Sequence, residues 1–272
     1  MKFERFLSIP ILMVFLLIGV VCYITVFIFI DDWVGLKSSA GSLNALVFIF
    51  LASLCLFSFF GCVLTDPGHV PASYVPDVED SAVSDQESKK SGHCDKCSTY
   101  KPPRAHHCRV CRRCVLRMDH HCLWINNCVG YWNYKAFLML VLYATLGCLY
   151  STVIIIKCAS QKDLEFSGRV SHKVFYVVSG IVMASLSLML GTLLGWHFYL
   201  ITHNMTTIEY YAGIRAAWLG KKSGQSYRHP YNLSIYTNIT SVLGPNVLKW
   251  LCPTSVGHLK DGLIFPTPRD SS

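Results

Sequence analysis

Cysteine and histidine are concentrated in one short stretch of the sequence. Seven of the 13 cysteines lie within residues 94–128. They are Cys94, Cys97, Cys108, Cys111, Cys114, Cys122 and Cys128. Two thiolates separated by two residues can reach one tetrahedral ion, and this spacing is typical of structural zinc sites. We therefore expect bound zinc to fold this stretch, which has too few apolar residues to form a core of its own.

The number of ligands leaves one thiol over. Two closed zinc sites of the Cys3His type use six cysteines and two histidines. The spacing leaves open whether the ligands divide sequentially, with His106 in one site, or interleave. Cys122 is the candidate for the free thiol, because an Asp and two His residues come immediately before it. Cys128 also lies outside a close pair, but its neighbours offer no base.

The segment "MDHHCLW" at residues 118–124 therefore holds the elements of nucleophilic catalysis. An adjacent imidazole can take the proton of a thiol, and a carboxylate can fix the tautomer of that imidazole and stabilise its charged form. We predict that Cys122 is a nucleophile, with a neighbouring histidine and Asp119 as the groups that activate it.

The rest of the chain predicts a membrane protein. The composition is 52% hydrophobic and only 15% charged, whereas soluble domains carry about 25% charge. Four apolar blocks each exceed the roughly 20 residues that cross a bilayer as a helix. They are Phe6–Ile30, Ser42–Leu64, Ala136–Ile156 and Val174–Ile201. The predicted fold class is an all-α polytopic membrane protein with four transmembrane helices and a small zinc-stabilised cytosolic domain between helices 2 and 3.

Five segments follow from this reading. Residues 1–64 hold transmembrane helices 1 and 2, 65–92 a cytosolic turn and flexible linker, 93–135 the zinc domain, 136–201 transmembrane helices 3 and 4, and 202–272 a cytosolic tail. We identify no internal repeat. In the tail, "EYYAGIRAAWLG" and "SVLGPNVLKWL" predict short amphipathic helices, which lie either on the membrane surface or against the protein.

The basic residues predict the orientation. Of the 24 Lys and Arg residues, 19 lie in the N-terminus, the central segment and the tail, and five lie in the other two loops. The positive-inside rule then places both termini in the cytosol. We expect a multi-pass protein of an endomembrane (Golgi or endoplasmic reticulum) or of the plasma membrane. The net charge of +8 is explained by basic faces beside an anionic leaflet, and we expect no nucleic-acid partner.

The stretch from His93 to Phe137 resembles the cysteine-rich domain of the DHHC protein S-acyltransferases (palmitoyltransferases). "DPG" at residues 66–68 and "TTIE" at residues 206–209 are similar to motifs that flank the family's second and fourth helices. The resemblance implies two interleaved structural zinc sites. Their ligands would be Cys94, Cys97, His107 and Cys114 in one, and Cys108, Cys111, His121 and Cys128 in the other.

The resemblance also implies the catalytic roles. Cys122 would be the acylated nucleophile and His120, oriented by Asp119, the base, while Thr207 and Glu209 would brace the site. Leu123 stands where most members have Pro. The family's C-terminal motif NPYDxGxxxN is partial here, with Asn238 matched and His229 a departure.

The expected activity is that of a protein-cysteine S-palmitoyltransferase. It would move a palmitoyl group from palmitoyl-CoA to cysteines of membrane-associated protein substrates by a ping-pong route through Cys122. Basic side chains of the zinc domain could bind the CoA phosphates. They are Arg104, Arg109, Arg112, Arg113, Arg117 and Lys135.

Two rival classes are weighed against this activity. A membrane-anchored adaptor with a RING-like zinc cross-brace fits interleaved ligands, but it has no use for a spare thiol beside His and Asp. A channel or transporter with a zinc regulatory domain would carry charge within its spans, and the four apolar blocks contain none in their cores.

Overall fold

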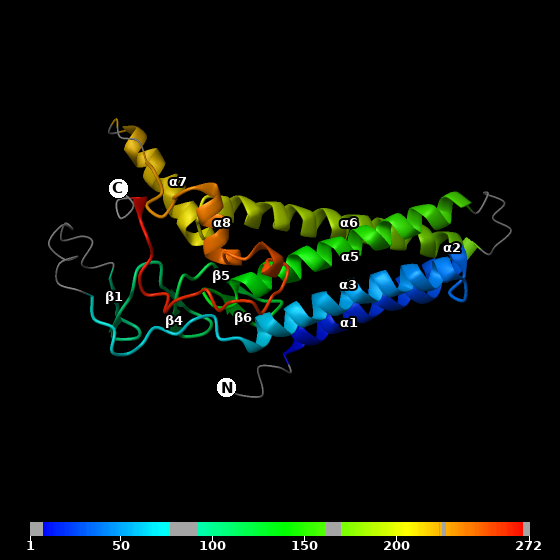
Figure 1. Cartoon of the computed structure of the whole chain (residues 1–272), viewed down its shortest axis with the longest axis horizontal. Coiled ribbons are helices and arrows are strands. Elements are labelled where there is room, and N and C mark those ends of the chain that lie inside the picture. Colours follow the sequence, from blue (N-terminus) through cyan, green and yellow to red (C-terminus); the bar gives the residue numbers. More distant parts are fainter. Residues whose placement is uncertain (1–7, 77–91, 162–169, 223, 225–226, 269–272) are drawn as a thin grey trace. The chain divides into compact units, whose positions relative to one another are not determined.

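The computed structural model describes residues 8–76, 92–161, 170–222, 224 and 227–268 (Figure 1). Most of the linker predicted within 65–92 therefore lies outside the described residues. The helices and strands are α1 (Ile9–Tyr23), η2 (Ile24–Ile30), α2 (Asp31–Val34), α3 (Ser39–Leu64), β1 (His93–Cys94), β2 (Thr99–Tyr100), β3 (His106–Cys108), β4 (Arg113–Val115), β5 (His120–Cys122), β6 (Asn127–Val129), α5 (Tyr134–Gln161), α6 (Val170–Thr202), α7 (Thr207–Lys222), α8 (Ile235–Leu243) and η4 (Val247–Lys249).

Four helices of the described chain are long and apolar enough to cross a membrane. They cover Ile9–Val34, Ser39–Leu64, Tyr134–Ser160 and Val174–Thr202. Each of the four predicted apolar blocks falls on one of them, and the cysteine-rich segment lies between the second and the third. The predicted fold class is therefore confirmed. The ends of the spans differ by several residues, because a helix continues past its apolar run when polar side chains follow.

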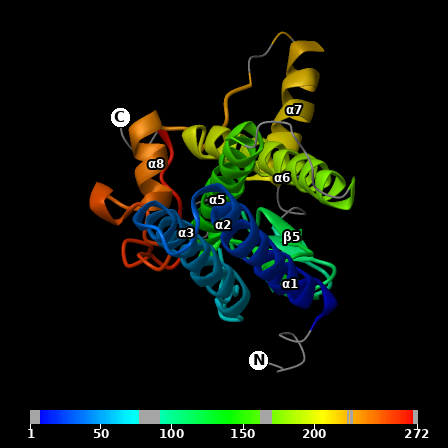
Figure 2. The same cartoon turned by 90° about the vertical axis from the view of Figure 1, so that its right-hand side faces the viewer.

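The first span is the clearest case. It runs on through Asp31 and Asp32 and contains a π-helical stretch, η2. The turn at Gly35, where φ is +74°, ends it and leads directly into α3. In both views α1 and α3 lie side by side (Figures 1 and 2). Phe15 and Phe59 make an edge-to-face contact between these two helices, with ring centroids 5.2 Å apart.

The chain forms two compact units. The first contains residues 1–60 and 138–196, and its helices are joined by an apolar cluster and a few buried hydrogen bonds. Thr25 and Ser151 are both fully buried, and their hydroxyl oxygens form a hydrogen bond of 2.7 Å. The hydroxyl of Tyr150 donates to the Asn44 side chain over 2.6 Å. Such bonds specify which faces of apolar helices meet, because apolar packing alone distinguishes them weakly.

The second unit contains residues 61–137 and 197–272. Its cysteine-rich part consists of three separate two-stranded antiparallel hairpins, β1–β2, β3–β4 and β5–β6. The apolar clusters between them are small and consist largely of cysteines. This agrees with the expectation that metal binding rather than a hydrophobic core holds the segment together.

The three hairpins repeat every 14 residues, so the expectation of no internal repeat was wrong. His93, His107 and His121 occupy the same position, and each is followed by a cysteine. The register is the same in each, with His93 opposite Tyr100, His107 opposite Cys114 and His121 opposite Cys128. The last residue of each turn has a positive φ, namely Ser98 at 51°, Arg112 at 53° and Asn126 at 45°. The repeat is hard to see in the sequence because its members share few residues besides His-Cys.

The tail forms one of the two predicted helices in full. α7 covers the whole of the first amphipathic stretch, whereas α8 covers only the first three residues of the second, and the short helix η4 covers three more. Asn238, fully buried on α8, donates to the carbonyl oxygen of Thr202 over 2.8 Å. It thereby attaches α8 to the end of α6. The matched asparagine of the partial C-terminal motif thus makes a structural contact.

Candidate functional site

The first metal cluster joins two hairpins. Cys94, at the end of β1, and Cys97, in the turn that follows it, meet His107 and Cys114, which face each other across β3–β4. The Nδ1 atom of His107 lies 3.5 Å from Sγ of Cys94, 3.2 Å from Sγ of Cys97 and 4.0 Å from Sγ of Cys114. A tetrahedral zinc ion with thiolate and imidazole ligands separates its ligand atoms by about 3.5–3.8 Å. The four side chains therefore fit one zinc ion.

The second cluster has the same arrangement as the first and lies one hairpin further along the chain. Cys108, at the end of β3, and Cys111, in the turn that follows it, meet His121 and Cys128, which face each other across β5–β6. The Nδ1 atom of His121 lies 3.5–3.6 Å from all three sulfur atoms. The separation again fits tetrahedral zinc. The structure thus brings together the two interleaved sets that the family resemblance implied, and not the sequential alternative with His106.

In each cluster, two cysteines at the turn of one hairpin meet the opposed His and Cys of the next hairpin along the chain. Three hairpins have two such junctions, and so they form two metal clusters. The turn of the third hairpin has no hairpin after it, and Ile125 stands where the first two have their second cysteine. Cys122 occupies the position of the ligands Cys94 and Cys108. Its thiol is left over because of this arrangement, and it belongs to neither cluster.

His120 contacts both neighbours that the chemistry requires. Its Nδ1 atom lies 2.7 Å from Oδ2 of Asp119. The imidazole also makes a hydrogen bond with the thiol of Cys122. Because β5 holds His120 and Cys122 on the same face of the strand, two residues apart, one imidazole can connect the thiol to the carboxylate.

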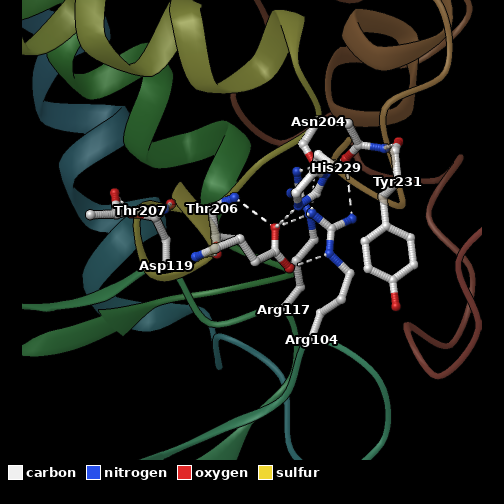
Figure 3. A network of polar contacts seen from close by, with 9 residues as sticks. Arg104, Arg117, Asp119, Asn204, Thr206, Thr207, His229 and Tyr231 are labelled. Carbon is white, nitrogen blue, oxygen red and sulfur yellow. Dashed lines mark hydrogen bonds and ion pairs between the residues drawn. The ribbon is translucent and has the colours of Figure 1, made fainter. Parts of the chain in front are cut away.

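Asp119 is fixed from its far side by α7. The backbone N–H of Thr207 donates to Oδ1 of Asp119 over 2.9 Å, and the Thr207 hydroxyl donates to Oδ2 over 2.8 Å. Asp119 is fully buried, and it meets the first turn of α7, where a helix presents free N–H groups and positive potential. The end of a helix 88 residues away thus orients the carboxylate (Figure 3).

The electrostatic environment favours charged forms of this pair. Burial raises the pKa of the Asp119 carboxyl, but hydrogen bonds from His120 and Thr207 more than offset this and hold it below its ordinary value. Burial would lower the pKa of His120, but its bonds with Asp119 and Cys122 outweigh burial and raise the pKa to about 9. An imidazolium held by a carboxylate stabilises a thiolate beside it.

"TTIE" forms a capping box at the start of α7. The Thr206 hydroxyl accepts from the N–H of Glu209 over 3.2 Å, and the Glu209 carboxylate accepts from the N–H of Thr206 over 2.8 Å. This exchange fixes the first turn of the helix. The first threonine and the glutamate therefore cap α7, while the second threonine holds Asp119. One short motif builds the helix end and connects it to the site.

Glu209 is also half of a buried ion pair. Arg104 donates to both carboxylate oxygens over 2.7 Å, and its side chain is 1% exposed. The guanidinium also donates to Asn204 and lies over the ring of Tyr231, 4.6 Å from its centroid (Figure 3). Burial raises the pKa of Glu209, but Arg104 and His229 hold it well below its ordinary value. The pair joins the zinc hairpins to the tail.

We expect Arg104→Met to destabilise the protein by about 3–5 kcal/mol, because it leaves the Glu209 carboxylate buried without its partner. Glu209→Gln should cost a similar amount, and the double variant less than the sum of the two. Denaturant unfolding of the purified protein measures these losses. Arg109→Met, at an exposed position, is the control and should change stability little. Additive losses from the two substitutions would contradict the pairing.

Several basic residues predicted to bind CoA have protein partners instead. Arg104 pairs with Glu209, and Arg117 is 5% exposed and lies over Tyr134. Lys135, 2% exposed, donates from Nζ to three carbonyl oxygens of the tail at 2.8–3.0 Å. We therefore withdraw these three residues as phosphate ligands. Charge is visible in a sequence, but a partner that is distant along the chain is not.

The remaining basic candidates differ in their surroundings. Arg113 donates to Asp66 over 2.7 Å, which attaches β4 to the "DPG" turn. Arg109 and Arg112 are exposed on the turn of β3–β4. These two are the candidate cations whose surroundings leave them accessible to an anionic ligand.

Leu123 lies at the exposed corner of the third hairpin and is 62% exposed. The same position holds the exposed residues Asp95 and Arg109 in the first two hairpins. Its carbonyl oxygen accepts from the N–H of Asn126 over 3.0 Å, which closes the turn. The position therefore accepts residues of very different kinds.

Comparison with known proteins places this geometry in a family. The family model described as "DHHC palmitoyltransferase" matches residues 87–214. "Probable protein S-acyltransferase 15" of Arabidopsis thaliana is 63% identical over 253 residues, which cover 93% of this chain and 100% of the relative. "Probable protein S-acyltransferase 16" of the same plant is 50% identical over 97% of this chain and 94% of its own length. "Palmitoyltransferase ZDHHC20" of Homo sapiens is 34% identical over 66% of this chain and 47% of its own length. The chain therefore belongs to the DHHC palmitoyltransferase family.

Proposed function

We propose that this protein-cysteine S-palmitoyltransferase uses palmitoyl-CoA as its acyl donor and forms an acyl-enzyme at Cys122. One observation supports the assignment above all. Cys122 is the cysteine of the hairpin segment that belongs to neither metal cluster, and it contacts His120, which Asp119 holds. A free thiol next to an oriented imidazole is the arrangement that activates a cysteine nucleophile.

The proposed reaction has two transfers. The Cys122 thiolate attacks the carbonyl carbon of the thioester, and the CoA thiolate leaves and takes the proton that His120 holds. A cysteine of the protein substrate then loses its proton to His120, attacks the acyl-enzyme and releases Cys122. A thioester replaces a thioester in each step, so orientation and proton transfer, rather than a large driving force, are what the protein must supply.

The two metal clusters would each hold a structural zinc ion. Both have four protein ligands and so leave no open position for a substrate, which is typical of structural sites. We propose that the ions fold the hairpins and thereby hold Cys122 beside His120. His120 itself is not a ligand in either cluster. We infer further that Arg109 and Arg112 meet the phosphates of CoA.

The proposal also sets an orientation. A palmitoyl chain partitions into the bilayer whereas CoA stays in water, so the thiol must lie near the membrane boundary. We propose that the hairpins, the tail and both termini are cytosolic, in an endomembrane or the plasma membrane. Membrane-associated proteins with accessible cysteines are the substrates that such a thiol can reach.

A two-stage transfer experiment tests the proposal. Purified protein in lipid nanodiscs is given palmitoyl-CoA that carries an alkyne, the excess donor is removed, and a cysteine peptide is then added. We expect hydroxylamine-sensitive label on the Cys122 peptide first and transfer of that label to the acceptor afterwards. Label on another residue, or transfer only while donor and acceptor are present together, would refute the acyl-enzyme. Donors of graded chain length in the same assay report the acyl preference.

Thr207→Val should slow acylation about 10- to 100-fold. A hydrogen bond to a charged group contributes about 1.5–3 kcal/mol, and the variant removes the hydroxyl that donates to Asp119 while its backbone N–H remains. The matched control is Thr207→Ser, which keeps a hydroxyl and should retain most activity. Single-turnover acylation measures both variants. Equal rates for Val and Ser would show that the hydroxyl does not orient Asp119.

A further inference from the structure

A second histidine, His197, lies beside His120. It belongs to α6, five residues before the helix ends at Thr202. The ring centroids of the two histidines are 6.1 Å apart, and Phe137 packs against both at 5.1–5.2 Å. His197 is 2% exposed. His197 has no part in the proposed two transfers, although its buried polar ring lies beside the histidine that contacts Cys122.

A buried hydroxyl fixes the tautomer of His197. The Tyr134 hydroxyl lies 2.9 Å from Nδ1 of His197, and Tyr134 is also 2% exposed. Among the described residues this nitrogen is the sole hydrogen-bond partner of the hydroxyl. A buried hydroxyl hydrogen needs an acceptor, so Tyr134 donates and Nδ1 accepts. Neutral His197 then carries its proton on Nε2.

Among the described residues, the side chain of His197 makes its hydrogen bond with Tyr134 through Nδ1, which leaves Nε2–H for a ligand. The position of His197 makes it suitable for a substrate. Tyr134 is the first residue of one candidate span and His197 lies near the end of another, so both stand at the boundary between hydrocarbon and water. A palmitoyl thioester must place its carbonyl group at this level, because its chain lies in the bilayer and its CoA does not. The nearby ammonium of Lys135 is engaged elsewhere, because it donates to three carbonyl oxygens of the tail.

We propose that His197 is a further catalytic residue, whose Nε2–H donates a hydrogen bond to the thioester oxygen during acyl transfer. This inference rests on the proposed function at Cys122. As the Cys122 sulfur bonds to the carbonyl carbon, the π electron pair moves to the oxygen and makes it an oxyanion. His197 stabilises that charge and remains protonated. When the carbonyl re-forms, the CoA thiolate leaves and takes its proton from His120.

A preorganised donor in a site that excludes water is effective because it needs no reorientation as the charge develops. Tyr134 supplies this preorganisation, since its hydrogen bond holds both the tautomer and the plane of the ring. The alternative is that the Tyr134–His197 bond only ties α5 to α6. The two explanations differ in which reactions of Cys122 depend on His197.

Two reactions of the Cys122 thiol distinguish an oxyanion donor from a purely structural hydrogen bond. Acylation by palmitoyl-CoA passes through an oxyanion, whereas alkylation by iodoacetamide displaces iodide at a saturated carbon and does not. We expect His197→Phe to lower the single-turnover acylation rate by about 100- to 1,000-fold and to leave the alkylation rate of Cys122 unchanged. Mass spectrometry of the Cys122 peptide measures both rates on the full chain in nanodiscs, with zinc content as a check of folding.

Two amide variants provide the matched comparison. Gln places its amide N–H near the position of Nε2, and Asn places its amide near Nδ1. We expect His197→Gln to recover more of the acylation rate than His197→Asn, and Tyr134→Phe to lose part of it. Equal rates for Gln and Asn, a parallel fall of acylation and alkylation, or no fall in acylation would each overturn the proposal. Failure of the proposed function has a different signature, namely acyl label that persists in Cys122→Ser.

Discussion

Cys122→Ser is expected to abolish autoacylation by palmitoyl-CoA, with a loss of about 10⁴-fold or more in rate. A serine hydroxyl is a far weaker nucleophile than a thiolate at neutral pH, and the His120–Asp119 pair is arranged for a thiol. The fold should persist, because Cys122 is no ligand in either cluster and serine is nearly the same size. In-gel fluorescence of an alkyne-labelled palmitoyl group measures the loss.

The variant must keep its metal for the result to be informative. We expect two zinc ions per chain by plasma emission spectrometry in both Cys122→Ser and the parent protein. Cys252→Ser, which removes an exposed cysteine of the tail, is the matched control and should label normally. Undiminished label in Cys122→Ser would remove this residue as the nucleophile.

The second large effect is expected from Cys108→Ser, which should unfold the hairpin segment. This cysteine is a ligand of the second cluster and is 2% exposed. A structural zinc site in a small domain contributes about 10–16 kcal/mol to folding, which matches or exceeds the whole stability of a typical domain. Zinc content should fall below two per chain, and the melting temperature should fall with it.

The two substitutions make opposite predictions for equivalent positions. Cys108 and Cys122 stand 14 residues apart at the same place in neighbouring hairpins. Loss of the first should remove metal and stability, whereas loss of the second should remove activity alone. A folded Cys108→Ser with two zinc ions per chain would contradict the ligand set and, with it, the identification of the free thiol.

The sequence was sufficient for the membrane architecture. Four apolar blocks specify four spans, because a helix satisfies the hydrogen bonds of its own backbone within the lipid. The spacing predicted the metal ligands as residues but left their division into sets open, and the family resemblance implied the interleaved sets that the structure brings together. Spacing allowed a sequential division with His106, and only the register of the hairpins, in which His107 faces Cys114 and His121 faces Cys128, shows why the sets interleave.

The supports of the site could not be predicted in this way. Arg104 was expected to meet CoA, but it pairs with Glu209, 105 residues further along the chain. His197 gave no signal, because a histidine in an apolar helix looks the same whether or not it contacts His120. The Thr206–Glu209 capping box has a local spacing that could have been recognised. Its link to Asp119 depends on how distant segments meet, which no local pattern records.

The 14-residue repeat has a consequence for how such a site could originate and be altered. In this row of hairpins, the turn of each hairpin forms a metal cluster with the hairpin that follows it. The last turn has a cysteine at the position of a ligand but has no further hairpin with which to form a cluster. In the proposed function, the reactivity of Cys122 then follows from its place in the last hairpin of the row. If a fourth hairpin followed and Ile125 were a cysteine, Cys122 would become a metal ligand. The thiol would then no longer be available as a nucleophile, and the segment would be a longer structural scaffold.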